Sequence, residues 1–329
     1  MKSSRATAWT ELLERSVVTP EQLAQVLPVD RAETEEVSAR YPLRINPYYL
    51  SLMRYPGDPI WLQVVPDRRE IEDTGGMEDP LDEERLSPVP NLVHRYPDRV
   101  LFLVSNQCAT YCRFCNRKRK IGLGFPVDES TFAQGLRYIA QHPEVRDVLL
   151  SGGDPLLLQD SVLDGLLGEL RAIPHVQIVR IGTRVPCTLP HRITASLCGV
   201  LRKHLPLYIS THFNHPWELT PQAKRACSRL ADSGIPLGNH TVLLRGVNDD
   251  PKVLGELMRA LVTARVKPYY LFHPDLVKGT SHFRPSITKG LYIMERLLRS
   301  VPQFCLPDYV VDLPHGGGKV PLLPADLRR

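Results

Sequence analysis

Three cysteines stand close together in the sequence, Cys108, Cys112 and Cys115, with the spacing C-x3-C-x2-C. Iron–sulfur clusters are normally held by four cysteinates, whereas this stretch supplies three. A four-iron cluster bound here would keep one iron open for another ligand. The spacing therefore predicts a [4Fe–4S] cluster with one vacant coordination position.

An open iron is typical of radical S-adenosylmethionine (SAM) enzymes, in which SAM binds that iron and one electron cleaves it to a 5′-deoxyadenosyl radical. A disulfide framework is disfavoured, because seven cysteines are an odd number in a long chain that shows no signal-peptide pattern. A structural zinc site would want a fourth Cys or His at short spacing. The remaining cysteines are expected to be small apolar residues of the core: Cys187, Cys198, Cys227 and Cys305.

The composition is that of a folded protein with a real hydrophobic core, and its mild positive charge fits an anionic small molecule as easily as a polyanion. The 329 residues, 43% of them hydrophobic, are enough for one large domain with or without a smaller companion. No apolar run is long enough to span a membrane, and the net charge of +5 is not arranged as a basic stripe with aromatics. We expect no membrane or nucleic-acid partner, and the oxidisable cluster favours a reducing cytoplasm.

An α/β scaffold is predicted to position the cysteines. Short apolar runs recur between helical patterns such as Phe132, Leu136 and Ile139, which stand at i, i+4 and i+7. The runs span residues 100–105, 148–151, 176–182, 207–212, 237–244 and 266–272. Buried runs without alternation, separated by helices, are typical of a parallel sheet. Six such units are too few for a closed eight-stranded barrel, so we predict an open partial (β/α)6 barrel of the radical SAM type.

The chain is expected to divide into three parts. Residues 1–90 should form an N-terminal helical region, with helices at 20–27 and 47–53, followed by an acidic linker rich in turn formers. Residues 91–300 should form the barrel, in which Thr220-Pro221 and Asp250-Pro251 are typical starts of helices. Residues 301–329 should form a short C-terminal segment that binds a second cofactor.

Polar motifs follow several of the predicted strands directly. The cysteines come after the first strand, Ser151-Gly-Gly-Asp154 ends the second, Thr211-His-Phe-Asn-His215 ends the fourth, and Asp275 follows the sixth. Because the carboxyl ends of parallel strands meet at one rim, these motifs are predicted to face one site.

The second cofactor is predicted from the stretch His315-Gly-Gly-Gly-Lys319. Glycines let the backbone approach a phosphate closely, and a lysine beside them can form a Schiff base with an aldehyde. Together they indicate pyridoxal 5′-phosphate (PLP) on Lys319, although a glycine-rich loop with one lysine is by itself more often a surface turn.

Taken in order, the motifs resemble those of the lysine 2,3-aminomutase family, which are PLP-dependent radical SAM enzymes. The resemblance runs from about residue 80 to the end of the chain. The segments that carry it are His94-Arg-Tyr-Pro-Asp-Arg99, the cysteine triplet with Arg117, Ser151-Gly-Gly-Asp154, Thr211-His-Phe-Asn-His-Pro216, Val242-Leu-Leu-Arg-Gly-Val-Asn-Asp249 and Gly-Gly-Gly-Lys319.

The resemblance implies roles for single residues. Lys319 would be the catalytic lysine that carries PLP, and the cofactor phosphate would be held by two cations and a phenol, Arg95, Tyr96 and Arg99. SAM would be bound by Ser151, Gly152, Gly153, Asp154 and His212. In this reading Asp154 accepts a hydrogen bond from the ammonium of SAM.

For the substrate, the resemblance implies that Arg117 binds the carboxylate and that Asp275 and Asp312 together bind a distant ammonium group. The implied reaction moves the α-amino group of L-lysine to C3 and gives β-lysine. A glutamate 2,3-aminomutase is disfavoured, because an acidic side chain would be repelled by two aspartates. A shorter branch of the family serves the β-lysylation of elongation factor P, but its members usually lack the Val-Val-Asp element that ends here at Asp312.

The sequence departs from the family pattern at two positions. His240 stands where the family usually has Gln, and Asp250 stands where a zinc-binding cysteine is expected, so oligomerisation through zinc is not predicted. A homo-oligomer of another kind stays open. Reduced ferredoxin or flavodoxin is the expected electron donor.

Overall fold

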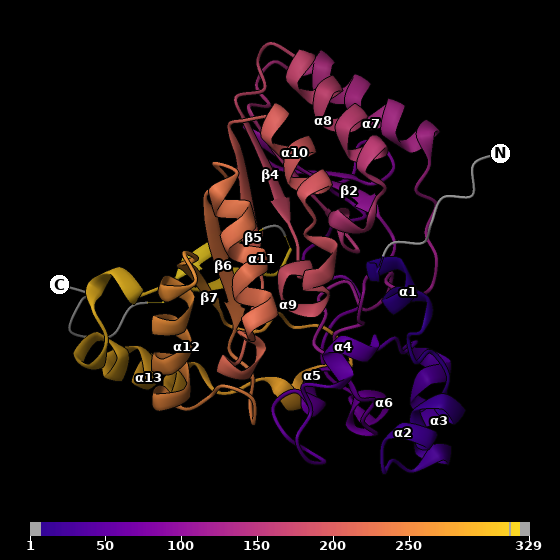
Figure 1. The fold of residues 1–329 in the computed structure, drawn as a ribbon, viewed down its shortest axis with the longest axis vertical. Coiled ribbons are helices and arrows are strands. Elements are labelled where there is room, and N and C mark those ends of the chain that lie inside the picture. The colour runs from indigo at the N-terminus through magenta and orange to yellow at the C-terminus, as the bar shows by residue number, and fades with distance from the viewer. Residues whose placement is uncertain (1–7, 316, 323–329) are drawn as a thin grey trace.

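A computed structural model describes residues 8–315 and 317–322. The chain is built around one nine-stranded sheet in which the strands follow in sequence order, β1 to β9 (Figure 1). The strands are β1 (Leu92–Tyr96), β2 (Arg99–Ser105), β3 (Asp147–Gly152), β4 (Ile178–Gly182), β5 (Leu207–Thr211), β6 (Leu237–Val242), β7 (Lys267–Phe272), β8 (Asp308–Leu313) and β9 (Gly318–Pro321). Gly316 and residues 323–329 of the predicted C-terminal segment lie outside the described residues.

The strands from β2 to β8 are parallel to one another, while β1 and β9 pair antiparallel at the two ends. The six predicted strands are confirmed as β2 to β7. The sheet has a seventh parallel strand, β8, which the sequence pattern did not predict. It follows a helix after β7 and continues the β/α rhythm into the C-terminal segment.

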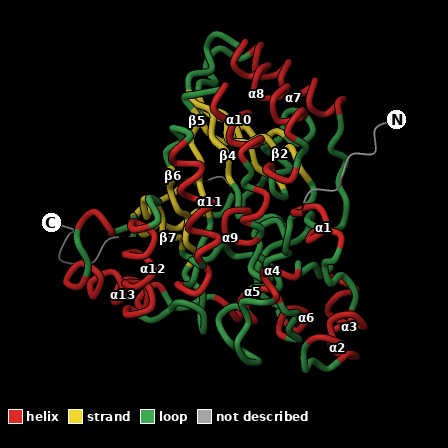
Figure 2. The backbone as a smooth tube through the Cα atoms, in the orientation of Figure 1, coloured by secondary structure: helices red, strands yellow, loops and turns green. Residues whose placement is uncertain are grey.

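Helices follow the strands and cover the outer face of the curled sheet (Figure 2). They are α7 (Glu129–Gln141), α8 (Asp160–Ala172), α9 (Val185–Thr188), α10 (Ala195–Lys203), α11 (Pro221–Asp232), α12 (Pro251–Thr263) and α13 (Ile287–Ser300). The predicted starts at Thr220 and Asp250 are confirmed: each side chain accepts a backbone N–H of the first turn, and proline follows it. Buried leucines of α8 and α12 pack the helices onto the sheet.

The N-terminal region is a group of short helices at one end of the barrel, drawn in indigo and purple in Figure 1. They are α1 (Ala8–Glu14), α2 (Pro20–Val26), α3 (Arg31–Arg40), α4 (Pro47–Leu50), α5 (Trp61–Val64) and α6 (Arg69–Glu72), so the helices predicted at 20–27 and 47–53 are confirmed as α2 and α4. Ile45 lies between Val17 and Thr110 in isolated bridges. The N-terminal region is thereby joined to the loop that carries the cysteines.

Among the residues that the structure describes, no helix is both long and apolar enough to cross a membrane.

Candidate active site

A cavity of about 630 Å³ opens at the carboxyl ends of the parallel strands. Its volume is in the range of sites that bind cofactors and small molecules. All fifteen residues predicted for the site line it: Arg95, Tyr96, Arg99, Cys108, Cys112, Cys115, Arg117, Ser151, Gly152, Gly153, Asp154, His212, Asp275, Asp312 and Lys319. The prediction that these motifs face one site is confirmed.

The cysteines lie at one end of the cavity, in the loop between β2 and α7. Burial raises the pKa of Cys115 to about 11 and the pKa of Cys108 well above its usual value. Within the described chain no three His, Cys, Asp or Glu side chains converge as a single metal ion requires. A four-iron cluster takes each thiolate at a different iron atom, and three thiols around one end of a cavity suit that donor set.

A buried ion cluster holds the cysteine loop against the N-terminal helices. Glu70 of α6 is fully buried, lies 2.6 Å from the guanidinium of Arg113 and also pairs with the ammonium of Lys118. Lys118 further donates to the backbone carbonyls of Arg113 and Gly279 at 2.8 and 3.1 Å. Burial lowers the pKa of Lys118 to about 8 despite the carboxylate. The basic residues near the cysteines are therefore paired inside the protein and do not form a solvated face.

The two glycines of the Ser151–Asp154 turn are needed because another backbone approaches them. A Cβ on Gly152 would lie 2.3 Å from the carbonyl oxygen of Ser105, and a Cβ on Gly153 would lie 2.2 Å from that of Gln107. Gly153 N–H donates to Ser105 at 2.6 Å, and the N–H of Asp154 donates to Gln107 at 2.7 Å. The turn is thus fastened to the chain that leads into Cys108.

Asp154 is fully engaged with protein donors. Its Oδ1 accepts from the Thr183 hydroxyl at 2.6 Å and from Leu156 N–H at 3.1 Å, while Oδ2 accepts the N–H groups of Arg184 and Val185 at 2.7 and 3.1 Å. Burial raises its pKa to about 6 in spite of these bonds. The structure therefore gives Asp154 a role that the sequence did not predict, which is to join the turn after β3 to the loop after β4. Its predicted bond to the ammonium of SAM stays a prediction.

Arg117 already has a carboxylate partner. Its Nη2 donates to Oε1 of Glu83 at 2.7 Å, and its Nε donates to Oε1 and Oε2 at 2.9 and 3.1 Å. Both side chains are largely buried. Glu83 belongs to the acidic linker, for which the sequence predicted only a connecting role. A bidentate pair of this kind fixes the plane of the guanidinium, so Glu83 orients Arg117 at the wall of the cavity.

Lys319 also lines the cavity. The antiparallel register of β8 and β9 places Lys319 directly across from Asp312, and Nζ lies 3.3 Å from a carboxylate oxygen. The other oxygen of Asp312 lies 2.8 Å from Arg95. Tyr96 accepts the Lys319 N–H at 3.2 Å, and the guanidinium of Arg99 lies 4.4 Å from the centre of the Tyr96 ring. Arg95, Tyr96 and Arg99 thus line the same cavity as Lys319, and two cations and a phenol suit a phosphate group.

Asp275 stands in the loop after β7, where Asn116 donates to it at 3.5 Å. Burial raises the pKa of Asp275 to about 7, and the negative charge of Asp312 adds to this rise. The predicted pair of aspartates is therefore close enough to interact, and both carboxyls line the cavity.

Two neutral histidines also line the cavity. His212 stacks on Phe114 with ring centres 5.6 Å apart, and burial lowers its pKa well below the usual value. His240 packs against the rings of Tyr269 and Tyr270, and burial lowers its pKa to about 3. The Nε2 atoms of both histidines are buried and have no hydrogen-bond partner in the described protein. They are free to serve a bound molecule, which gives His240 a place in the site but does not explain why it replaces glutamine.

The comparison with known proteins agrees with this geometry. The model of the radical SAM superfamily matches residues 102–257. The chain is 49% identical over 300 residues to an L-lysine 2,3-aminomutase of Methanococcus maripaludis, covering 90% of this chain and 69% of that protein. It is 46% identical to an L-lysine 2,3-aminomutase of Fusobacterium nucleatum subsp. nucleatum over 96% of this chain and 76% of the relative. It is 43% identical to a glutamate 2,3-aminomutase of Clostridioides difficile over 95% of this chain and 75% of the relative.

One cavity lined by three thiols, a lysine, two arginines and a phenol fits a [4Fe–4S] cluster, SAM and PLP, and buried histidine nitrogens without a partner in the described protein are left for a bound molecule. With identities of 43–49% over nine-tenths or more of its length, the chain belongs to the lysine 2,3-aminomutase family of radical SAM, PLP-dependent isomerases.

Proposed function

We propose that the protein moves the α-amino group of L-lysine to C3 and releases β-lysine. The observation that carries this proposal is the pair Asp275 and Asp312 at the Lys319 end of the cavity. Two carboxyls suit a substrate whose side chain ends in an ammonium group, and they repel one that ends in a carboxylate. Relatives named for lysine and for glutamate both exist at similar identity, so the choice between these substrates depends on these side chains.

When bound, the cluster and SAM supply a one-electron route to hydrogen abstraction at C3, and PLP supplies a π-system across which the amino group can move. The protein positions the reacting groups and excludes water. In this proposal Arg117, oriented by Glu83, binds the substrate carboxylate. Lys319 holds the cofactor aldehyde, and Arg95, Tyr96 and Arg99 hold its phosphate. The turn Ser151–Gly153 and His212 contact SAM.

Buried charged side chains of the site are paired with one another in the absence of cofactor and substrate. Asp312 lies between Arg95 and Lys319, with oxygens 2.8 and 3.3 Å from the two cations. In the proposed function, Arg95 would pair with the cofactor phosphate and Asp312 would pair with the substrate ammonium. Each exchange replaces one charged partner by another, so that no group is left buried and unpaired.

The affinity for lysine is expected to rise with pH through about pH 7. Asp275 has a pKa of about 7 and is protonated below that value, so binding of the lysine ammonium must there release a proton. With one proton released, KM at pH 6 should be about tenfold higher than at pH 8, while the lysine side chain stays charged over this range. KM measured at constant ionic strength between pH 6 and 8 checks this.

Asp275→Asn provides the control for the pH experiment. It should raise KM at pH 8 by about 30-fold or more, since removing one partner of a buried charge pair costs about 2–5 kcal/mol. It should also flatten the profile between pH 6 and 8. A wild-type KM that does not change with pH would contradict the assignment of Asp275.

The substrate is tested by offering L-lysine and L-glutamate to anaerobically reconstituted protein with PLP, SAM and dithionite. We expect β-lysine at a rate at least about a hundredfold above that of β-glutamate, since like charges in the site cost several kcal/mol. Chromatography of the derivatised amino acids measures both. Preferential formation of β-glutamate would refute the proposed substrate.

We further propose that reduced ferredoxin or flavodoxin supplies the electron and that the protein works in the reducing cytoplasm, where an oxidisable cluster persists. A homo-oligomer remains part of this proposal without an assigned interface.

A further inference from the structure

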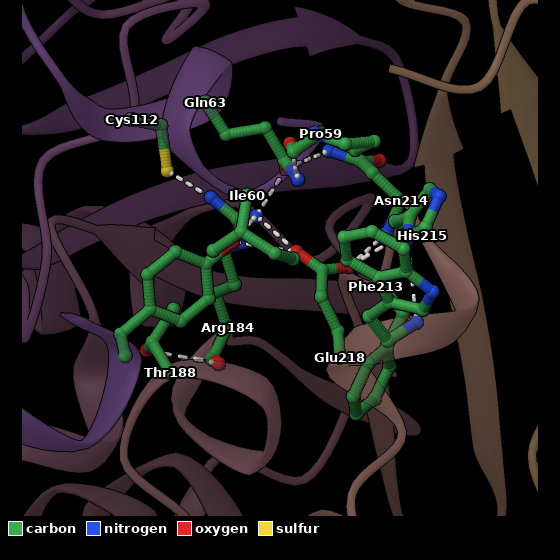
Figure 3. Close-up of polar contacts among 12 residues, drawn as sticks. Pro59, Ile60, Gln63, Cys112, Arg184, Thr188, Phe213, Asn214, His215 and Glu218 are labelled. Atoms are coloured by element: carbon green, nitrogen blue, oxygen red, sulfur yellow. Dashed lines mark hydrogen bonds and ion pairs between the residues drawn. The ribbon is translucent and has the colours of Figure 1, made fainter. Parts of the chain in front are cut away.

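The guanidinium of Arg184 lies between a cluster cysteine and a buried carboxylate (Figure 3). Arg184 is the second residue after the end of β4, and it lines the same cavity as the cysteines and the Ser151–Asp154 turn. Its Nη1 donates to Cys112 Sγ at 2.7 Å, and its Nη2 lies 2.8 Å from Oε1 of Glu218. One planar cation therefore contacts a sulfur on one side and an anion on the other.

The surroundings hold this cation in place. Nη2 also donates to Gln63 Oε1 at 2.6 Å and to the Tyr49 hydroxyl at 3.0 Å. Glu218 is fully buried, and its second oxygen accepts the backbone N–H groups of Asn214 and His215 at 2.5 and 2.9 Å. Gln63, Tyr49 and Glu218 hold Nη2 in place. We therefore expect Nη1 to stay directed at Cys112 when the cysteine binds iron.

The charges of this arrangement bear on the redox state of the cluster. Reduction potentials of iron–sulfur clusters depend on hydrogen bonds to their sulfurs, on net charge and on exposure to solvent. A cation beside Cys112 stabilises the reduced cluster, which carries one more negative charge. The carboxylate of Glu218 lies behind the cation and offsets part of that effect. Because the side chain of Arg184 is only 10% exposed, solvent screens these interactions weakly.

We propose that Arg184 is a positioning residue for the iron–sulfur cluster, which sets the reduction potential through its hydrogen bond to Cys112, with Glu218 moderating its charge. This inference rests on the proposed cluster site at Cys108, Cys112 and Cys115. It extends that site to a residue 72 positions further along the chain, which contributes no iron ligand. Partners behind the ligands are known to tune metal sites in this way.

The test compares two variants that should shift the potential in opposite directions. In Arg184→Gln the cation is lost, and the ratio of reduced to oxidised cluster at a fixed applied potential should fall about tenfold, which corresponds to about 59 mV for one electron. In Glu218→Gln the anion behind the cation is lost, and the same ratio should rise severalfold. The ratio is measured by potentiometric titration with EPR detection, on reconstituted protein without SAM.

Arg265→Gln is the matched control, since Arg265 is an exposed arginine paired with Asp232 and its loss should leave the potential unchanged. Arg184→Lys keeps the charge but not the planar fork, and should shift the potential in the same direction as Arg184→Gln by a smaller amount. If Arg184→Gln retains no cluster, Arg184→Lys and Glu218→Gln decide the question.

The outcomes separate this inference from its rivals. Iron and sulfide content report whether the cluster site itself is right, whereas the potential reports on Arg184. Arg184 lines the cavity, and its Nε atom is buried without a partner in the described protein. An arginine that served only SAM, or only the packing of its neighbours, would leave the potential without SAM unchanged in all three variants. That result would overturn the proposal.

Discussion

Cys115→Ala is expected to abolish the iron–sulfur cluster and, with it, the isomerase activity. Cys115 lines the cavity together with Cys108 and Cys112, and no further cysteine lies close to them in the chain. Two thiolates are too few to hold a four-iron cluster. Iron should fall from about four atoms per chain to less than one, the visible absorbance of the cluster should disappear, and SAM cleavage should drop below detection.

Cys305→Ala is the control for this experiment. Cys305 is buried in the apolar core next to α13 and has no polar partner in the described structure. Its loss removes one small side chain from the core and should cost at most about 1 kcal/mol of stability. Iron content and activity should therefore stay at the wild-type level. A Cys115→Ala protein that keeps its full iron and sulfide after reconstitution would contradict the assignment of the cluster.

The parts of the molecule that the sequence predicted well are those that depend on local pattern. Buried parallel strands are continuous apolar runs, and the six such runs became β2 to β7. The location of the site was predicted from the rule that active sites of such folds lie at the carboxyl ends of the parallel strands. For that reason Cys108, Asp154 and Asp275, far apart in the chain, were correctly expected in one cavity.

The seventh parallel strand and the final hairpin were harder to predict. β9 contains Gly318 and Pro321, which are poor strand formers, and it is stabilised by pairing with β8. The register of that pairing places Lys319 across from Asp312. Local sequence shows neither the pairing nor the contact that follows from it.

Contacts between distant segments also escaped prediction. Arg117 is paired with Glu83 of the linker, and Arg184 reaches Cys112 across 72 positions. The carboxylate oxygens of Asp154 accept hydrogen bonds from four protein donors. In each case the residue type was visible in the sequence, but its partner is set by tertiary structure. The sequence does contain one indication that Arg184 belongs to the site. It stands two residues after the end of a predicted strand, as other motifs of the rim stand close to strand ends.

Lys319→Ala is expected to abolish covalent attachment of PLP while the cluster remains. Lys319 is the cavity-lining lysine of the described chain, and Arg95, Tyr96 and Arg99 line the same cavity. Its side chain is 36% exposed, and Asp312 keeps Arg95 as a partner at 2.8 Å when the lysine is removed. The variant should therefore fold, because no buried charge is left unpaired.

Activity of Lys319→Ala should fall at least about a hundredfold, since misplacing a reacting group by about 1 Å already costs that much. Borohydride reduction followed by peptide mass mapping measures the attachment: PLP should be fixed to the peptide that contains Lys319 in the wild type and to no peptide in the variant. Lys289→Ala, a half-buried lysine at the start of α13 that does not line the cavity, should behave as the wild type. The iron content should be unchanged in both variants, which would show that Lys319→Ala loses PLP and not the cluster. Full activity and normal PLP attachment in Lys319→Ala would show that another lysine carries the cofactor, and the end of the cavity assigned to it would then be wrong.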